Sequence, residues 1–341
     1  MQTIWSKVKA DLKQKAIPID VVLELTRKCN LSCCHCYNFK DNAELSFVQV
    51  KDIARQLRQA GTLFLSLTGG EIFTKADIFE ICFYLRQSCF ALSIFTNGTL
   101  INQSNIKIIR ELDLNEVGIS IQGAIAKTHD KIVGCQGAFA KSINAIKLLK
   151  NAQIPVNLKC TLMQDNFAEY HDLIKLASEL GVPYIIDPVV SPKDDGSKDV
   201  LAHRLDEKQL FDFYQNELLE QNSFMQKKEE DPDADFSCPA GTVMASISAK
   251  GDVYPCIQLP KKLGNVFDTD FRGIWENSKF LTELREKTNI PACRNCRLAA
   301  YCTRCPGLAY LEDGNAFGIS SIACINAAVY EKIVKQETLN K

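Results

Sequence analysis

An alternation of apolar and amphipathic segments over residues 20–187 constrains the fold of this chain more than any other feature. Six apolar runs predict strands at 20–25, 63–67, 90–95, 116–121, 155–162 and 183–187. The amphipathic segments between them predict helices at 46–58, 76–87, 103–111, 137–151 and 168–179. Strands that alternate with helices form a parallel sheet, open or curled into a barrel. Either form is an α/β fold that binds ligands at the carboxyl ends of its strands.

Changes in composition divide the chain into four expected segments. They are an N-terminal helix, the strand–helix alternation, an acidic linker and a cysteine-rich domain, over residues 1–17, 18–190, 191–237 and 238–341. The linker carries 13 Asp/Glu and six Lys/Arg between positions 192 and 235, and is expected to be solvated, with a helix at 206–220. The last segment has turn signals, seven cysteines and little periodicity, which indicates a domain stabilised by metal.

Cysteine usage is the anomaly of the composition, with 15 cysteines among 341 residues. Disulfide-dense proteins are usually small and secreted, whereas this chain is long and begins without the apolar run of a signal peptide. No apolar run approaches the roughly 18 residues that a membrane span needs. A formal net charge of −1 gives no basic surface for nucleic acid. We therefore expect a cytoplasmic protein, without membrane or nucleic-acid partners, whose clustered cysteines bind metal.

The first cysteine cluster follows the first predicted strand directly. It reads Cys29-x3-Cys33-x2-Cys36, and its place after a strand puts it at the carboxyl edge of the sheet. Three thiolates suit an iron–sulfur cluster, whose usual complement is four cysteines, and would leave one iron open to a ligand. The alternative is a zinc site completed by His35, because three cysteines and a histidine are a common zinc set. Cys34, between the ligands, is expected to be a packed thiol.

Followed by an aromatic residue, Tyr37, this cluster resembles that of the radical S-adenosylmethionine (SAM) superfamily. The resemblance implies a partial (β/α)6 barrel in which the three cysteines bind a [4Fe-4S] cluster and its open iron binds SAM. A second match follows the second strand, where Thr68-Gly69-Gly70-Glu71 is similar to the family's Gly-Gly-Glu motif for the methionyl amino group. Glycines allow close backbone approach, and a carboxylate pairs with an ammonium group.

The resemblance implies further SAM contacts at later strand ends. By position these are a packing contact of Tyr37 near the adenine, polar contacts of Thr96, Asn97 and Ser120, and a contact of Lys159 with the carboxylate. An ordinary surface lysine is the alternative for Lys159. Two positions depart from the family pattern: Ile72 replaces the proline that usually follows Gly-Gly-Glu, and Gln122 stands where Ser-x-Asp-Gly is common.

The second cysteine set reads Cys238-x12-Gly251-x4-Cys256, then Cys293-x2-Cys296-x5-Cys302-x2-Cys305, then Cys324. This pattern resembles the SPASM extension of peptide-modifying radical enzymes. The resemblance implies two auxiliary [4Fe-4S] clusters, hence three in all. The outer one would be held by Cys293, Cys296, Cys302 and Cys324, and the inner one by Cys238, Cys256 and Cys305. A zinc ribbon is the alternative, but it needs only four of these seven cysteines.

The inner auxiliary cluster would have only three thiolates. Some relatives supply a fourth cysteine about six residues before the first, where this chain has Pro232. We therefore expect an open iron there, or a non-thiolate ligand such as Asp235 or a sulfur atom of the substrate.

If the resemblance holds, the enzyme cleaves SAM to a 5′-deoxyadenosyl radical that abstracts a hydrogen atom from the substrate. SPASM enzymes mostly modify ribosomally made peptides, by thioether or carbon–carbon crosslinking or related oxidations. Small-molecule chemistry such as tetrapyrrole decarboxylation is the alternative on the same scaffold. A zinc-stabilised, non-enzymatic binding module is a third hypothesis.

Two positions bear on the catalytic base. Sulfatase-maturing relatives carry a carboxylate directly after the Gly-x4-Cys cysteine, where this chain has Ile257, which argues against that activity. Asp187 ends the sixth strand and is a candidate base or substrate contact, with a strand-end cap as the alternative.

The expected partners follow from the peptide-modifying hypothesis. They are a precursor peptide and a reductant such as flavodoxin or ferredoxin. Only 28 residues precede Cys29, too few for a domain that binds a leader peptide. A separate leader-binding protein is therefore expected.

Overall fold

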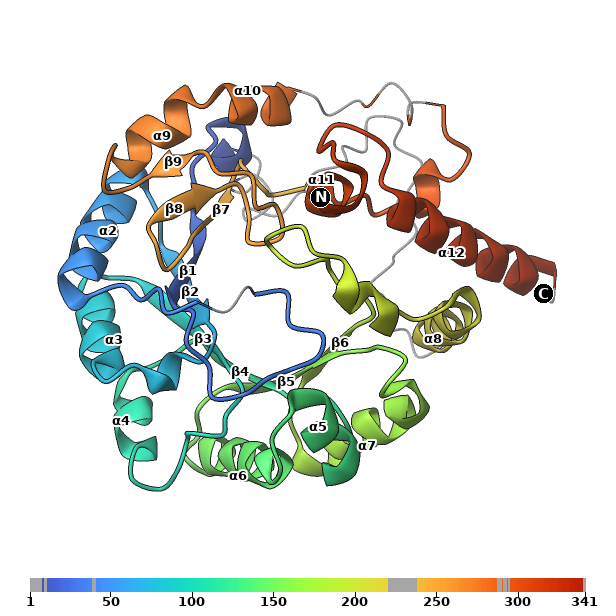
Figure 1. Ribbon diagram of the computed structural model, residues 1–341, viewed down its shortest axis with the longest axis horizontal. Coiled ribbons are helices and arrows are strands. Elements are labelled where there is room, and N and C mark those ends of the chain that lie inside the picture. Colours follow the sequence, from blue (N-terminus) through green and yellow to red (C-terminus); the bar gives the residue numbers. More distant parts are fainter. Residues whose placement is uncertain are drawn as a thin grey trace.

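A nine-stranded sheet forms the centre of the computed structural model (Figure 1). The structure describes residues 8, 11–38, 41–219, 238–286, 290, 293 and 295–339. Six strands pair in parallel and in chain order, over Asp20–Thr26 (β1), Phe64–Gly69 (β2), Ala91–Thr96 (β3), Glu116–Ser120 (β4), Val156–Thr161 (β5) and Tyr184–Asp187 (β6). All six predicted strands and the α/β partial barrel are thereby confirmed.

Helices cover the outer face of this sheet (Figure 1). They span Phe47–Ala60 (α2), Ile78–Gln87 (α3), Ile106–Glu111 (α4), Ala126–Val133 (α5), Ala138–Asn151 (α6) and Tyr170–Leu180 (α7). Of these, only α5 is absent from the sequence prediction. Leu23, Leu67 and Ile94 of the strands are fully buried in the main hydrophobic core, together with apolar side chains of these helices. Alternate side chains of each strand point to opposite faces, so polar residues such as Glu24, Thr68 and Ser120 face the barrel interior.

The C-terminal part of the chain continues the same sheet. Met244–Ile247 (β7) pairs in parallel with β1, and Asp252–Tyr254 (β8) and Gly264–Asn265 (β9) follow in antiparallel. Its helices are Phe271–Asn277 (α9), Lys279–Glu286 (α10), Pro306–Asp313 (α11) and Ser321–Leu339 (α12). The sequence shows little periodicity here because these strands are only two to four residues long. β7 is stabilised by pairing with β1, which is distant in sequence.

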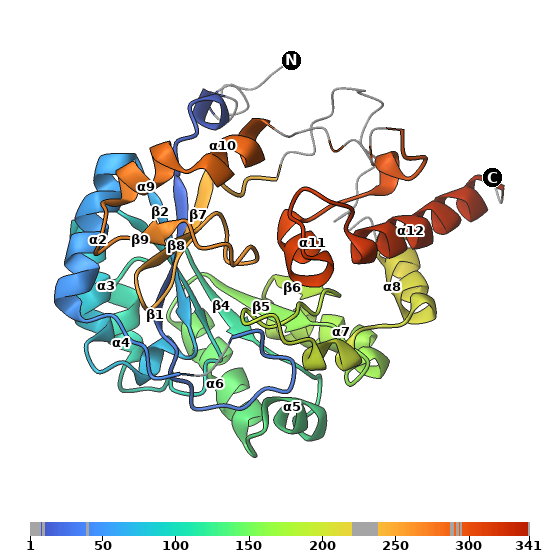
Figure 2. The same ribbon diagram turned by 45° about the horizontal axis from the view of Figure 1, so that its top comes forward.

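Long-range contacts attach the flanking segments to the barrel. Residues 11–16 lie beside α10 in Figure 2, and the indole of Trp275 in α9 donates a 2.7 Å hydrogen bond to the Ala16 carbonyl oxygen. After β6 the chain forms a short 3-10 helix, Asp199–His203 (η3), and then Glu207–Leu219 (α8), close to the predicted helix. Arg204, between them, makes a bidentate ion pair with Glu312 of α11 at 2.8 and 2.6 Å. Residues 220–237 lie outside the described part.

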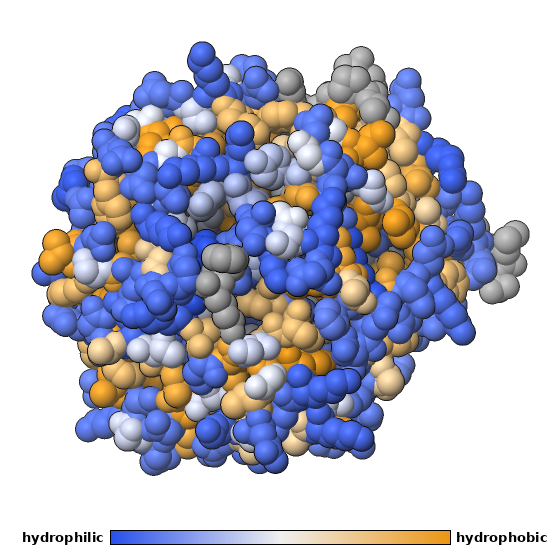
Figure 3. Space-filling view, in the orientation of Figure 1, coloured by the Kyte–Doolittle hydropathy of each residue, from blue (hydrophilic) through white to orange (hydrophobic). Residues whose placement is uncertain are grey.

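The surface is mostly polar on the face that Figure 3 shows, with apolar residues gathered near α11 and α12. Among the described residues, every helix is too short or too polar to cross a bilayer.

Candidate active site

A cavity of about 240 Å³ lies at the carboxyl ends of the barrel strands. The structure brings most of the predicted cluster and SAM residues together in its wall: Cys29, Cys33, Cys36, Tyr37, Gly69, Gly70, Thr96, Asn97 and Ser120. They come from the loop after β1 and from the ends of β2, β3 and β4, as expected for parallel strands whose carboxyl ends share one edge. Gln122, one of the departures from the family pattern, also lines this cavity.

The cysteine loop is held in place by α5. The backbone amides of Ser32 and Cys34 donate to the carbonyl oxygens of Val133 and Ile132, at 2.9 and 3.0 Å. Leu31, which is 4 % exposed, packs with Val133 and Ala138 in a small hydrophobic cluster that also contacts Cys29 and Cys33. The helix that the sequence analysis missed therefore positions two of the three cluster cysteines.

A hydrogen-bonded chain joins the same loop to the end of β3. The side chain of Asn97 donates to Asn30 Oδ1 at 2.9 Å, and Asn30 donates in turn to Thr99 Oγ1 at 2.9 Å. Asn97, predicted as a SAM contact, thus also fixes the residue that follows Cys29.

Gly69 and Gly70 are required by the backbone that passes beside them. A Cβ atom on Gly69 would overlap the Thr26 carbonyl oxygen, and one on Gly70 would overlap the Lys28 carbonyl oxygen. The amides of Gly70 and Glu71 donate to these two carbonyl groups, each at 2.8 Å. The sequence analysis assigned the glycines to cofactor approach. The structure adds that they let the end of β2 lie directly against the chain that leads into Cys29.

Glu71 lies beneath the cavity rather than in its wall. It is fully buried and accepts hydrogen bonds from Thr96 Oγ1 at 2.7 Å, from the Asn97 amide at 2.8 Å and from the Phe73 amide at 3.0 Å. Burial raises its pKa, and these three donors oppose the effect. The carboxylate therefore ties the ends of β2 and β3 together below the predicted SAM site.

Replacing Glu71 by alanine should destabilise the fold strongly. Two backbone amides and one hydroxyl would lose their acceptor in a buried place, at about 1–3 kcal/mol for each buried group left unpaired. We expect the free energy of unfolding, measured by urea titration, to fall by about 3 kcal/mol or more. Glu80→Ala on the exposed side of α3 is the control and should change it by less than about 0.5 kcal/mol. Equal values for the two variants would contradict this role of Glu71.

Lys159 does not line the cavity. Its Nζ lies 3.0 Å from Glu116 Oε1 and 4.3 Å from the centre of the Phe95 ring. The side chain passes over Gly118, where a Cβ would overlap the lysine Cε. It therefore runs back along the barrel interior, away from the strand ends.

Asp187 does not line the cavity either. Its Oδ1 accepts a 2.9 Å hydrogen bond from the Val189 amide, which is the strand-end cap weighed as the alternative. Burial raises its pKa.

The side chains of the cysteine loop fit both metal sites that the sequence allows, an iron–sulfur cluster on three cysteines or a zinc site completed by His35. The three cysteines line one cavity, and His35 lines it too. Burial and the neighbouring His203 lower the pKa of His35 to about 4, so the imidazole is neutral and able to bind metal. Cys34 is exposed rather than packed, so that expectation was wrong, whereas Cys82 and Cys160 are buried.

The C-terminal cysteines form two groups. Burial raises the pKa of Cys256 to about 11, and the nearby thiols of Cys238 and Cys305 add to the effect. Burial also raises the pKa of Cys302 to about 11, here with contributions from Cys324, Cys293 and Cys296. These neighbours are the sets that the resemblance implies for the inner and outer auxiliary clusters. Pro232 and Asp235, named in the hypothesis of an open inner cluster, lie outside the described residues.

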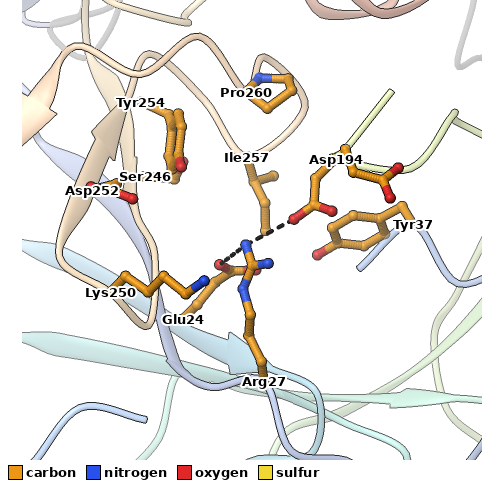
Figure 4. A pocket seen from close by; sticks show the side chains of 11 residues that line it. Glu24, Arg27, Tyr37, Asp194, Ser246, Lys250, Asp252, Tyr254, Ile257 and Pro260 are labelled. Carbon is orange, nitrogen blue, oxygen red and sulfur yellow. Dashed lines mark hydrogen bonds and ion pairs between the residues drawn. The ribbon is translucent and has the colours of Figure 1, made fainter. Parts of the chain in front are cut away.

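A second cavity, of about 220 Å³, lies between the barrel and the β7–β8 hairpin (Figure 4). It shares Arg27 and Tyr37 with the cysteine cavity, and the sequence analysis named neither Arg27 nor Glu24 as a site residue. Arg27 pairs with Asp194 of the acidic linker at 2.8 Å, so this part of the linker belongs to a cavity wall. Burial raises the pKa of Tyr37 well above its ordinary value.

Comparison with known proteins agrees with this geometry. Residues 23–177 match the radical SAM superfamily and residues 238–297 match SPASM, an iron–sulfur cluster-binding domain. The chain is 30% identical over 297 residues to the mycofactocin maturase MftC of Mycobacterium tuberculosis, covering 82% of this chain and 75% of that protein. It is 28% identical over 326 residues to the AdoMet-dependent heme synthase of Methanosarcina barkeri, covering 86% and 93%.

Solved structures share the fold. SuiB of Streptococcus suis, bound to its precursor peptide SuiA, superposes with a TM-score of 0.71 at 18% identity, over 93% of this chain and 79% of SuiB. The enzyme anSMEcpe with bound AdoMet gives a TM-score of 0.70 at 19% identity, over 95% of each chain. Together with the cysteine-lined cavity and the two C-terminal cysteine groups, these matches show that the chain belongs to the radical SAM superfamily and carries a SPASM domain.

Proposed function

We propose that this radical SAM/SPASM enzyme modifies a ribosomally made peptide, by a thioether or carbon–carbon crosslink or a related oxidation. The observation that carries the proposal is the pair of adjoining cavities, one lined by three cysteines and the other open beside it. Two relatives support it: the mycofactocin maturase MftC, and the antilisterial bacteriocin subtilosin biosynthesis protein AlbA of Bacillus subtilis, which is 28% identical over 88% of this chain. A cluster and SAM, when bound, would supply the 5′-deoxyadenosyl radical.

The residues around the cysteine cavity divide into two roles in this proposal. Cys29, Cys33 and Cys36 would bind a [4Fe-4S] cluster, because three thiols on one loop suit a cluster with one open iron. The backbone at Gly69 and Gly70, with Tyr37, Thr96, Asn97 and Ser120, would hold SAM and exclude water from it. Glu71 would act by fixing Thr96 and Asn97, and Lys159 would contact SAM only after leaving Glu116.

The auxiliary clusters are proposed on the two C-terminal groups of cysteines. With three [4Fe-4S] clusters, the reconstituted protein should contain about 12 iron atoms. The inner group offers three thiols, Cys238, Cys256 and Cys305. We therefore propose that the fourth iron of the inner cluster has a ligand other than these thiols or is open.

The alternative is a small-molecule substrate such as a tetrapyrrole. The AdoMet-dependent heme synthases favour it, because one of them is 28% identical to this chain and has 93% of its length covered. The cavity beside the cysteine site holds about 220 Å³, whereas pockets for drug-sized ligands usually hold about 300–1,000 Å³. This size fits one peptide side chain better than a macrocycle.

The partners belong to the same proposal. They are a precursor peptide, a separate protein that binds its leader segment, and a reductant such as flavodoxin or ferredoxin. A reducing cytoplasm is the proposed location, and the cysteine-rich, metal-binding type of sequence supports it.

The test is anaerobic reconstitution with iron, sulfide, SAM and dithionite, followed by quantification of 5′-deoxyadenosine. We expect a brown, iron-containing protein that forms 5′-deoxyadenosine, and whose turnover increases with a precursor peptide encoded beside its gene. An increase with a tetrapyrrole that carries carboxylate side chains instead would favour the tetrapyrrole alternative. A colourless zinc protein that leaves SAM intact would refute both enzymatic hypotheses.

A further inference from the structure

The cavity between the barrel and the β7–β8 hairpin contains a buried carboxyl group that accepts no hydrogen bond from the described residues. Glu24, in the middle of β1, is 6 % exposed. Of the hydrogen bonds in the described part of the chain, none ends on its carboxyl group, and its one ion pair there is with Arg27 at 3.9 Å. Figure 4 shows the carboxyl group facing the cavity beside Arg27. Buried carboxyl groups normally accept hydrogen bonds, so the acceptor capacity of Glu24, used only by the long ion pair with Arg27, is available to a ligand.

The charges around Glu24 favour a positively charged ligand. The cations in the cavity wall are Arg27 and Lys250, and the carboxylates there are Glu24, Asp194, Asp195 and Asp252. Asp194 pairs with Arg27 at 2.8 Å, whereas Lys250 pairs with Asp41 at 2.6 Å and Asp252 with Lys262 at 2.5 Å, both partners lying outside the cavity wall. Negative charge therefore remains in excess in the cavity, and the nearest cation to Glu24 is Arg27 at 3.9 Å. An anionic group would meet this excess of negative charge, whereas an ammonium or guanidinium group would complete the pairing.

The raised pKa of Glu24 agrees with a carboxyl group that has no close cation beside it. Burial, aided by the carboxylates of Asp194 and Asp41 and opposed by Arg27, raises its pKa to about 7. A cation bound beside it would stabilise the ionised form and lower that pKa.

The cavity that contains Glu24 adjoins the cysteine cavity, where SAM is proposed to bind. It shares the walls formed by Arg27 and Tyr37 with the cysteine cavity, so a group held there lies next to the proposed SAM site. On the basis of the proposed function, we infer that this cavity receives a basic side chain of the substrate peptide and that Glu24 is the carboxylate that binds it. The inference deepens the proposal, because it selects a lysine or arginine side chain over the carboxylate groups of a tetrapyrrole.

The test uses n-butylammonium as a probe for such a side chain and butyrate as its anionic counterpart. Their binding to the reconstituted enzyme with SAM is followed by broadening of the probe's NMR signals. We expect n-butylammonium to bind wild type about tenfold more tightly than Glu24→Gln, from the loss of one charge-assisted hydrogen bond. Glu80→Gln, on the exposed side of α3, is the matched control and should bind like wild type. Equal affinity of wild type and Glu24→Gln, a preference for butyrate, or no binding of either probe would overturn the inference.

A second measurement needs no variant. Binding of n-butylammonium to wild type should weaken as the pH falls below about 7, because protonation removes the Glu24 charge. The other titratable or charged groups that act on Glu24 or line the cavity with it are Arg27, Tyr37, Asp41, Asp194, Asp195, Lys250, Asp252 and Tyr254. Affinity that is constant from pH 8 to pH 5.5 would contradict the inference. Assaying 5′-deoxyadenosine in the same samples separates the inference about Glu24 from the proposed function. An enzyme that cleaves SAM but does not prefer the amine refutes the inference alone. An enzyme that prefers the amine but does not cleave SAM refutes the proposed function alone.

Discussion

Replacing Cys29, Cys33 and Cys36 together by alanine should abolish 5′-deoxyadenosine formation. These thiols are the only cysteines among the described residues that line the cavity at the strand ends, so their loss removes every sulfur ligand there. We expect the iron content of the reconstituted protein to fall by about four atoms per chain, with the auxiliary clusters retained. The measurements are iron and sulfide analysis and quantification of 5′-deoxyadenosine after reduction with dithionite.

Cys34→Ala is the matched control within the same loop. Cys34 is exposed and does not line the cavity, so its removal should leave iron content and 5′-deoxyadenosine formation within about twofold of wild type. If the triple variant keeps its iron and cleaves SAM, the cluster is bound elsewhere and the proposed site is wrong. If Cys34→Ala alone loses about four iron atoms, the ligand assignment is wrong.

The six parallel strands could be predicted because each one carries its own signal. Apolar residues fill the strand positions that face the helices, and helical segments separate the strands in sequence. β7 has only four residues and is stabilised by pairing with β1, from which more than 200 residues separate it. A local pattern does not contain that information. α5 was missed for a related reason, since it has eight residues and contributes just two apolar residues, Ile132 and Val133, to its buried face.

The candidate site was predictable where spacing within one loop or strand end defines it. Cys29, Cys33 and Cys36 belong to such a spacing, as do Gly69 and Gly70. The expectation for Lys159 depended on the direction of a long side chain, and the structure turns that side chain toward Glu116 because Gly118 leaves room beside it. Glu24 was overlooked because a polar residue at an alternate strand position is ordinary in sequence. Its importance depends on Asp194 and the β7–β8 hairpin, which only the fold brings near.

Replacing Gly69 by alanine should destabilise both the fold and the cluster site. The new Cβ would overlap the Thr26 carbonyl oxygen, and the backbone at Gly69 has a φ of +150°, which side-chain-bearing residues rarely adopt. We expect the free energy of unfolding to fall by about 3 kcal/mol, the sum of strained backbone and overpacking. Because Thr26 leads into the cysteine loop, iron incorporation should fall as well. Urea titration and iron analysis measure the two effects.

Gly70→Ala separates close approach from backbone strain. Gly70 lacks a positive φ, but its Cβ would overlap the Lys28 carbonyl oxygen, immediately before Cys29. We therefore expect a smaller loss of stability, of about 1–3 kcal/mol, with a comparable loss of iron. Gly273→Ala in α9 is the control, since its Cβ would meet side-chain atoms only at 3.3 Å or more and should change stability by less than about 1 kcal/mol. Full iron content in both Gly69→Ala and Gly70→Ala would show that the cysteine loop does not depend on these glycines. The motif would then serve the cofactor alone, as the sequence by itself suggested.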